Sequence, residues 1–210
     1  LMAVTFTANT AVSVYATGVT ATENAQTIDA QSTDAQALTP EEQKAQELQQ
    51  VYDMPVESNG YKDWPQGPGT YGEAGIVMEV GTGAILYAKN IDAHEYPASI
   101  TKVLTALVAL ENGQLTDNVT FSHDSVAFLQ RGDSSVGLKE GNVITLDQAM
   151  HAMLLASANE AAYAIGESVG VNVGHDYNWF IEQMNSRCKE LGGENSNFAN
   201  TNGLHDPNHY

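Results

Sequence analysis

A serine and a lysine three residues apart, Ser99 and Lys102, stand at the start of the most apolar helical stretch of the chain, residues 97–113. Residues i and i+3 share one face of a helix, so the lysine amine can reach the serine hydroxyl. A serine hydroxyl is a weak nucleophile until a neighbouring base accepts its proton. A neutral Lys102 can be that base, and the amide groups at a helix start favour a developing anion.

A lysine acts as a base only when it is uncharged. With a reference pKa of about 10.4, neutralising it at pH 7 costs about 4.6 kcal/mol. Burial can lower a lysine pKa by up to about 3–5 units, so this chemistry requires a water-poor cleft. The alternative interpretation is that Ser99 only caps the helix while Lys102 extends to solvent. Ser186 and Lys189 repeat the spacing in a polar stretch, where we expect a surface location.

A second pair of polar residues, Ser157 and Asn159, lies between two predicted helices in LLASANEAAYAIGES. Either residue is a good N-cap for the helix that begins near Glu160, so a purely structural role is the alternative. The functional interpretation gains weight because both patterns occur in one chain. One pattern supplies a nucleophile and a base, and the other supplies a hydroxyl and an amide.

Together these segments resemble the serine-type D-alanyl-D-alanine carboxypeptidases, the low-molecular-mass penicillin-binding proteins. YPASITKVLTALVALE is similar to the helix that carries the nucleophile in this family, and LDQAMHAMLLASANEAAYAIGE is similar to its Ser-x-Asn segment. MEVGTGAILYAKN resembles the opening hairpin, and CKELGGENSNFANTNGLHDPNHY resembles the stretch after the Ser-x-Asn helix. The resemblance runs from about residue 70 to residue 210.

The resemblance implies a role for each of the four residues. Ser99 would be acylated by the penultimate D-alanine, Lys102 would be the general base, and Ser157 would relay a proton to the leaving amine. Asn159 would bind the substrate amide, and the Ser99 backbone N–H would form half of an oxyanion hole. The implied partners are peptidoglycan stem pentapeptides that end in D-Ala-D-Ala, and β-lactam antibiotics as covalent inhibitors. We expect no cofactor and no metal.

Two other functions stay open at this point. A serine β-lactamase of the related fold would need a deacylating glutamate after the Ser-x-Asn helix, and no sequence like ExxLN follows residue 159. The third candidate is an envelope binding module that has the fold but no activity. The third motif of the family, Lys-Thr-Gly, does not occur before Tyr210. We therefore expect an N-terminal fragment that lacks the later sheet strands and is inactive by itself.

The order of the elements predicts an α+β fold of the β-lactamase and transpeptidase type. Two apolar runs around Gly81-Thr82-Gly83 predict a β-hairpin. We expect helices over residues 99–112 and 176–191, and short strands and turns over residues 114–144. The expected architecture is an antiparallel sheet flanked by helices, with a helical cluster that carries the Ser-x-Asn motif.

Local signals predict several helix ends. Gly113 is expected to follow the first helix as a C′ residue, a position at which glycine tolerates a left-handed backbone. Thr145 and Gln148 have the spacing of a capping box, and one face of the helix that follows is apolar through Leu154. Asp176 is expected to cap the last helix.

Composition excludes several classes of function. The chain has 210 residues and a net charge of -18, with only eight Lys and Arg. A nucleic-acid partner is therefore not expected, because phosphate backbones require a basic face. The single cysteine, Cys188, excludes an intrachain disulfide and a cysteine-based zinc site. His205 and His209 flank Pro207, which argues against a helix presenting both to a metal.

The first part of the chain is expected to lie outside the catalytic domain. Residues 1–16 resemble the end of an export signal, with small Ala16 at a signal-peptidase site. Residues 17–68 are predicted to be an acidic low-complexity spacer with a short helix near 40–52. The incomplete catalytic domain is expected over 69–210. Export would place the protein at the outer face of the bacterial cytoplasmic membrane or in the cell wall.

Overall fold

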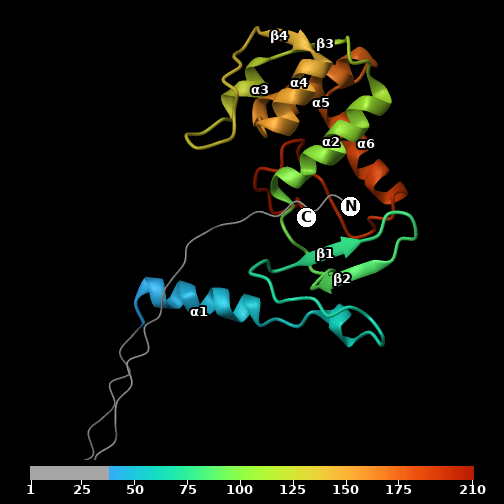
Figure 1. Ribbon diagram of the computed structural model, residues 1–210. Coiled ribbons are helices and arrows are strands. Elements are labelled where there is room, and N and C mark those ends of the chain that lie inside the picture. Colours follow the sequence, from blue (N-terminus) through green and yellow to red (C-terminus); the bar gives the residue numbers. More distant parts are fainter. Residues whose placement is uncertain (1–37) are drawn as a thin grey trace, which may run out of the picture. The chain divides into compact units, whose positions relative to one another are not determined.

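The computed structural model describes residues 38–210 (Figure 1). The predicted export signal and the first part of the predicted spacer lie outside these residues. The described residues form six α-helices and two small antiparallel sheets of two strands each. None of the described helices is long and apolar enough to cross a membrane.

Helix α1 spans Pro40–Tyr52, the range in which the sequence predicts a short helix. Thr39 and Glu42 form its capping box: the Glu42 amide donates to the Thr39 hydroxyl at 3.3 Å, and the Thr39 amide donates to the Glu42 carboxylate at 2.8 Å. No residue of α1 is buried. This exposure agrees with the polar and acidic composition of the stretch.

Strands β1 (Gly75–Met78) and β2 (Ile85–Lys89) pair antiparallel and form the predicted hairpin. The Glu79 carboxylate holds the turn, because it accepts hydrogen bonds from the Gly81 and Thr82 amides at 2.8 and 2.7 Å. The turn closes through a left-handed glycine, Gly83, whose φ is 72°. The prediction of a hairpin at this position is confirmed.

The chain that precedes the hairpin packs against β2. Lys89 is fully buried, and its amine donates to the carbonyls of Val51 and Thr70 at 2.6 Å each. The Ala88 amide donates to the buried Ser58 hydroxyl at 3.1 Å. The sequence predicts an acidic spacer over residues 17–68, whereas the structure packs Val51 and Ser58 of this range against β2. The physical reason is that a buried ammonium requires acceptors, and the preceding chain provides them.

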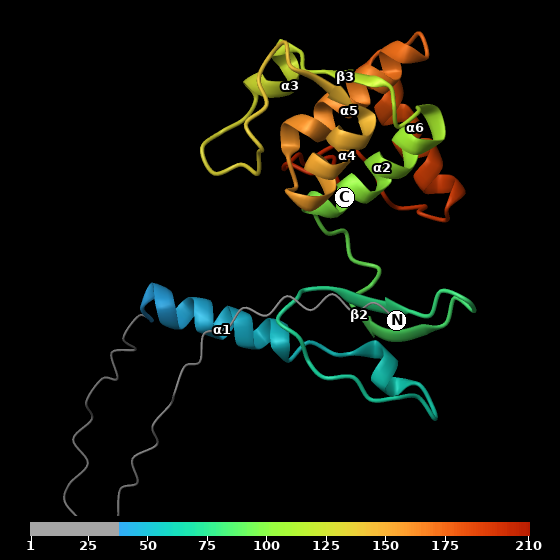
Figure 2. The same ribbon diagram turned by 45° about the horizontal axis from the view of Figure 1, so that its top comes forward.

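The remaining helices form one cluster (Figure 2). Helix α5 contacts α2, α3, α4 and α6, so it lies at the centre of the cluster. It is rich in alanine and glycine, and small side chains let neighbouring segments approach closely. The bounds are α2 Thr101–Asn112, α3 His123–Ala127, α4 Leu146–Leu155, α5 Asn159–Asn172 and α6 Tyr177–Glu190.

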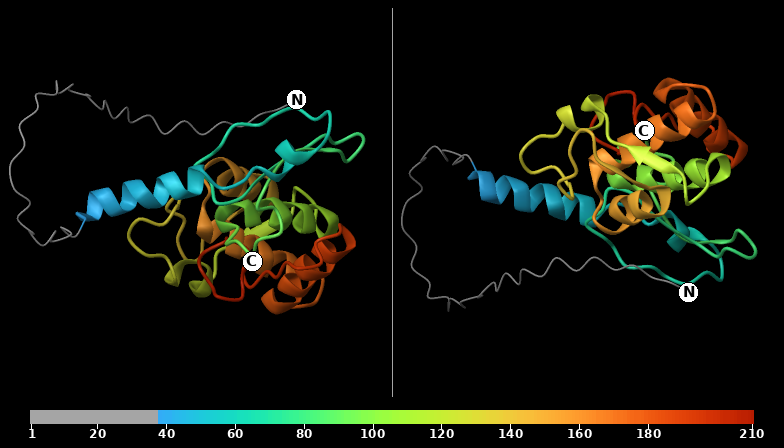
Figure 3. Two further views of the ribbon diagram at one scale, coloured as in Figure 1. Left: turned by 90° about the horizontal axis from the view of Figure 1, so that it is seen from below. Right: turned by 90° about the horizontal axis from the view of Figure 1, so that it is seen from above.

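The second sheet pairs β3 (Asn118–Thr120) with β4 (Val143–Thr145), and β3 contacts α5 (Figure 3). Strand β4 leads directly into α4, where Thr145 and Gln148 form the predicted capping box. Helix α3 falls in the segment where the sequence predicts only strands and turns. It is a single short helix that the Ser122 hydroxyl caps. Because this helix has only one turn, the sequence shows no helical periodicity of hydrophobic residues that would predict it.

At two positions the structure adds detail that the sequence does not predict. Gly113 has φ −139° and ψ 168°, which is extended backbone and not a left-handed cap. The reason is that the chain leaves α2 toward β3 at once, through a turn that the Asp117 carboxylate stabilises by accepting the Gln114 amide at 2.8 Å. Leu154 is 49% exposed. The buried residues of α4 are Leu146, Ala149, Met150 and Met153, and Leu154 is not among them.

Helix α2 starts at Thr101, two residues later than predicted, and a short 3₁₀ turn, η2 (Ala98–Ile100), precedes it. The sequence predicts a helix buried on nearly all sides. In the structure, α5 and α6 cover the face that carries Val108 and Ala109, whereas Val103 is 66% exposed. The described residues therefore leave one apolar side of α2 open.

Candidate active site

Ser99 and Lys102 lie on the same side of the η2–α2 segment. The Lys102 amine is 3.0 Å from the Ser99 hydroxyl oxygen. Just before the serine, Ala98 has a φ of +46°, a left-handed conformation that is uncommon for a residue other than glycine. Such local strain persists where the surrounding structure imposes it. The backbone thus turns sharply into the serine.

The backbone beside the serine is packed against the loop around Gly203. Gly203 has a φ of +83°, and a Cβ added there would lie 1.7 Å from the Ala98 carbonyl oxygen and 3.0 Å from the Ser99 amide nitrogen. Only glycine permits both this backbone conformation and this close approach. The loop therefore fixes the position of the nucleophile from outside its own helix.

Ser157 donates a hydrogen bond to the Ser99 hydroxyl oxygen over 2.9 Å. It lies in the junction between α4 and α5 and has a left-handed φ of +55°. The N-cap of α5 is Ala158, and no side chain caps this helix end. The alternative in which Ser157 or Asn159 serves only as a helix cap is therefore excluded by the structure.

Lys102 donates hydrogen bonds to three oxygen atoms. These are the Ser99 hydroxyl at 3.0 Å, the Asn159 side-chain oxygen at 2.8 Å and the Asn202 carbonyl at 2.6 Å. The amide and carbonyl oxygens can only accept, whereas a hydroxyl can also donate. A neutral amine therefore keeps two N–H groups for Asn159 and Asn202 and turns its lone pair toward the hydroxyl of Ser99. In this geometry the Ser99 hydroxyl is the one partner of Lys102, among the described residues, that can give the neutral amine a proton.

Burial lowers the pKa of Lys102 to about 8, and the negative charge of Glu160 opposes this shift. At this value roughly one molecule in ten carries a neutral amine at pH 7. Lys102 is 2% exposed, whereas Ser99 is exposed. The predicted water-poor cleft is therefore only partly present: the described residues cover the base and leave the nucleophile open.

Sequence reasoning missed the contribution of the segment after α6. Besides the Asn202 carbonyl, the Thr201 carbonyl accepts from the Thr105 hydroxyl at 2.7 Å. The resemblance extends over this segment, but a backbone carbonyl leaves no mark in the residue types. These contacts nonetheless attach the segment along the buried side of α2.

His209 is a structural residue of that segment. Its Nδ1 accepts from the Ala199 amide at 3.1 Å, so its Nε2 carries the proton and donates to the Thr101 hydroxyl at 2.7 Å. Burial lowers the pKa of His209, which favours this neutral form. Within residues 38–210 no three His, Cys, Asp or Glu side chains form a group that could hold a metal ion.

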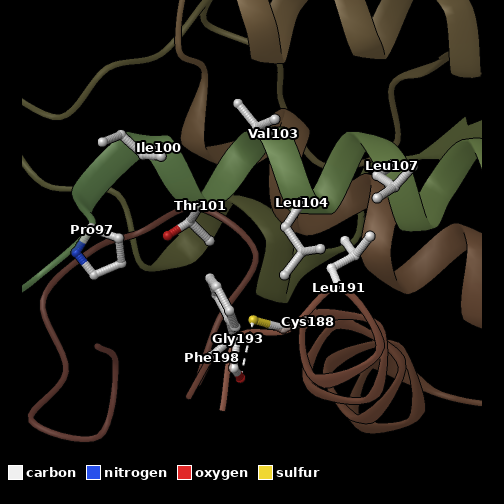
Figure 4. A pocket seen from close by; sticks show the side chains of 10 residues that line it. All are labelled: Pro97, Ile100, Thr101, Val103, Leu104, Leu107, Cys188, Leu191, Gly193 and Phe198. Carbon is white, nitrogen blue, oxygen red and sulfur yellow. Dashed lines mark hydrogen bonds between the residues drawn. The ribbon is translucent and has the colours of Figure 1, made fainter. Parts of the chain in front are cut away.

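The second Ser-x-x-Lys pair, Ser186 and Lys189, is exposed on α6 and no hydrogen bond joins the two side chains in the described structure. Nearby, Cys188 lines an apolar pocket of about 470 Å³ between α2 and the end of α6. Figure 4 shows Leu104 of α2 pointing toward Cys188 and Leu191 across this pocket. The pocket is apolar and Ser99 is not among the residues that line it, so the polar cluster is the candidate active site.

A serine, a lysine and a second serine joined by hydrogen bonds on an α+β scaffold define a class: the serine hydrolases and transpeptidases with the penicillin-binding fold. The sequence profile of the D-alanyl-D-alanine carboxypeptidases, peptidase family S11, matches residues 65–210. The chain belongs to this family.

Curated relatives include D-alanyl-D-alanine carboxypeptidase DacF of Bacillus subtilis, 32% identical over 143 residues, which are 66% of this chain and 35% of the relative. DacA of Haemophilus influenzae is 33% identical over 140 residues, or 64% of this chain and 35% of the relative. The chain thus spans about a third of the length of these relatives.

Solved structures give the same assignment. Penicillin binding protein 5 of Haemophilus influenzae matches with a TM-score of 0.61 and 31% identity, over 70% of this chain and 43% of that protein. The Streptomyces K15 DD-transpeptidase matches with a TM-score of 0.58 and 29% identity, over 64% of this chain and 53% of that protein. The predicted α+β fold of the β-lactamase and transpeptidase type is confirmed.

Proposed function

We propose that this protein is a serine D,D-carboxypeptidase that removes the terminal D-alanine from peptidoglycan stem pentapeptides through an acyl-enzyme. Family membership supports the reaction class. The observation that carries the proposal is the 3.0 Å contact between the Lys102 amine and the Ser99 hydroxyl, with Ser157 on the same oxygen at 2.9 Å.

In the proposed acylation, the Ser99 oxygen attacks the carbonyl carbon of the penultimate D-alanine while Lys102 takes the hydroxyl proton. The carbon–nitrogen bond then breaks, and Ser157 passes its own proton to the departing amine of the terminal D-alanine while it takes up the proton that Lys102 received, so that both side chains return to their starting protonation. Asn159 holds the substrate amide beside the cluster. Water attacks the resulting ester, releases the shortened peptide and returns the proton to Ser99, which restores the starting state.

β-Lactams enter the proposal as covalent inhibitors, because their strained amide offers a carbonyl that the same serine can attack. The proposed substrate lies outside the cytoplasmic membrane, so the proposal includes export to the cell surface. The export-signal features of residues 1–16 support this location from sequence alone.

The test is intact-mass analysis of the full-length protein after incubation with benzylpenicillin. We expect one adduct of the mass of the antibiotic, which is lost in Ser99→Ala and retained in Ser186→Ala. Ser186 is the matched control because it has the same spacing to a lysine but lies exposed on α6. A membrane-impermeant fluorescent penicillin should label the protein on intact cells.

Three results would contradict the proposal. Absence of an adduct would favour the inactive binding module, and an adduct that persists in Ser99→Ala would assign the nucleophile elsewhere. An adduct that is hydrolysed rapidly, so that the enzyme turns over many molecules of penicillin, would indicate a serine β-lactamase.

A further inference from the structure

Glu160 carries a buried charge that the proposed reaction does not use. Its side chain is fully buried in the first turn of α5. Its Oε1 accepts from the Ser135 hydroxyl at 2.7 Å and from the Val136 and Gly137 amides at 2.8 and 3.2 Å. Its Oε2 is buried and has no hydrogen-bond partner in the described structure. Such a carboxylate is costly to bury, so its position requires a reason.

The loop that Glu160 holds is attached to the candidate active site by a second contact. The Asn159 amide donates to the Ser134 carbonyl at 2.9 Å. The side chain of Asn159 in turn accepts from the Lys102 amine at 2.8 Å. Residues 134–137, the start of α5 and the amine of the base therefore form one connected set. A loop released from Glu160 would loosen the hold on Asn159.

Glu160 also acts on Lys102 through its charge. Among the described residues it is the charged group that shifts the pKa of Lys102, and it raises this pKa against the effect of burial. The hydrogen-bond partners of the amine, Ser99, Asn159 and the Asn202 carbonyl, are neutral. The groups on Oε1 of Glu160 are a hydroxyl and two amides, which are also neutral.

We infer that Glu160 is a positioning residue for acylation of Ser99: its carboxylate holds residues 134–137 against the start of α5 and keeps Asn159 in place beside Lys102. Glu160 itself exchanges no proton and touches no reacting atom. The inference rests on the proposed function, because its consequences are read from the acylation of Ser99. A residue with only a structural role would change stability alone.

The first test compares Glu160→Gln with the parent protein in the rate of acylation by a fluorescent penicillin between pH 5 and 10. We expect the maximal rate to fall about tenfold, because three charge-assisted hydrogen bonds become neutral ones. We also expect the acid limb of the profile to move to lower pH. Without the negative charge, burial lowers the pKa of Lys102 further, so the amine becomes neutral at lower pH.

Glu167→Gln is the matched control. Glu167 lies two turns further along the same helix, and one of its carboxylate oxygens is likewise buried without a partner. The variant Glu167→Gln removes the same charge from α5 and breaks none of the hydrogen bonds that residues 135–137 donate to Glu160. We expect Glu167→Gln to acylate at the rate of the parent protein and to have the same acid limb in its pH profile. An equal shift of the limb in both variants would overturn the inference.

Ser135→Ala separates the loop contact from the charge. Ser135 is exposed, so the variant should fold, and it removes one donor to Glu160 while keeping the carboxylate. We expect slower acylation with an unchanged acid limb. The double variant that combines Glu160→Gln and Ser135→Ala should lose less acylation rate than the two single losses predict when they are combined, because both changes act on one contact.

The outcomes distinguish the inference from the proposed function. If the parent protein acylates Ser99 and Glu160→Gln matches it in rate and acid limb, the inference is wrong and the proposed function stands. If the parent protein forms no adduct at Ser99, both fail. If Glu160→Gln does not fold, parent-like acylation of Ser135→Ala overturns the inference.

Discussion

Lys102 is the residue on which the proposed chemistry depends, and its surroundings determine when its amine is neutral and able to act as a base. The structure removes the amine from water and offers three oxygen acceptors, of which only the Ser99 hydroxyl can reverse its role. Burial disfavours the charged form of the amine. The same contacts that satisfy an ammonium therefore direct the lone pair of the neutral amine to the nucleophile.

This environment should appear in the pH dependence of stability. The folded-state pKa of Lys102 is about 8, below its ordinary value of 10.5. Between these values the unfolded chain binds a proton that the folded chain does not, so stability from this group rises with pH. We expect the unfolding free energy of the parent protein, minus that of Lys102→Met, to rise from pH 8 to about pH 10.5.

The measurement is urea unfolding of both proteins at a series of pH values. The contributions of the other titrating groups to the pH dependence cancel in the difference between the two proteins. Lys139→Met is the control, because Lys139 is exposed, and its difference from the parent protein should stay constant. A difference for Lys102→Met that is flat or falls with pH would mean that the amine is not desolvated in the folded state.

At the scale of elements, the site is assembled from three segments that are distant in sequence. These are the start of α2, the α4–α5 junction and the loop at residues 200–204. The loop meets the backbone of Ala98 at Gly203, so a change of one methyl group there acts on the nucleophile without changing any catalytic side chain. Catalysis by positioning is sensitive to displacements of about 1 Å.

We therefore expect Gly203→Ala to lower the rate of penicillin acylation by about 100-fold and to destabilise the fold by about 2–4 kcal/mol. The added Cβ would collide with the Ala98 carbonyl and displace Ser99. The measurements are stopped-flow acylation and urea unfolding.

Gly174→Ala is the matched control for the backbone conformation. Gly174 has a φ of +85° but no atom within 4 Å of an added Cβ, and it lies beyond the other end of α5 from Asn159. It should lose only about 1–2 kcal/mol and acylate at the parent rate. Equal acylation by both variants would show that the Gly203 contact does not position the serine.

Over the whole molecule, the features that the sequence predicts are those that depend on residues close to one another in the chain. The contact of Ser99 with Lys102 follows from a spacing of three residues, and the Thr145 and Asp176 caps follow from side chains that reach their own helix. Ser157 is 58 residues from Ser99, so its place in the site came from the resemblance to a family. Spacing alone carries no information over that distance.

Features that arise only from tertiary packing were not predictable. The burial of Glu160 and the acceptor role of the Asn202 carbonyl depend on where loops return to the helices. The extended backbone at Gly113 depends on the direction in which the chain leaves α2. The partial exposure of α2 was missed because its composition indicates burial on all sides, whereas helices cover only one side in the described residues.

The charge of the whole chain leads to the last prediction. With 26 acidic and eight basic side chains, the chain has a net charge of -18, and mutual repulsion between carboxylates opposes the compact state. Salt shortens the range of this repulsion from about 10 Å at 0.1 M to about 3 Å at 1 M. We expect the Tm to rise between these concentrations of NaCl, as measured by circular dichroism at pH 7. Choline chloride should have the same effect, because screening depends on ionic strength and not on the cation. A Tm that falls in both salts would mean that attractive ion pairs such as Arg187 with Glu111 outweigh the repulsion.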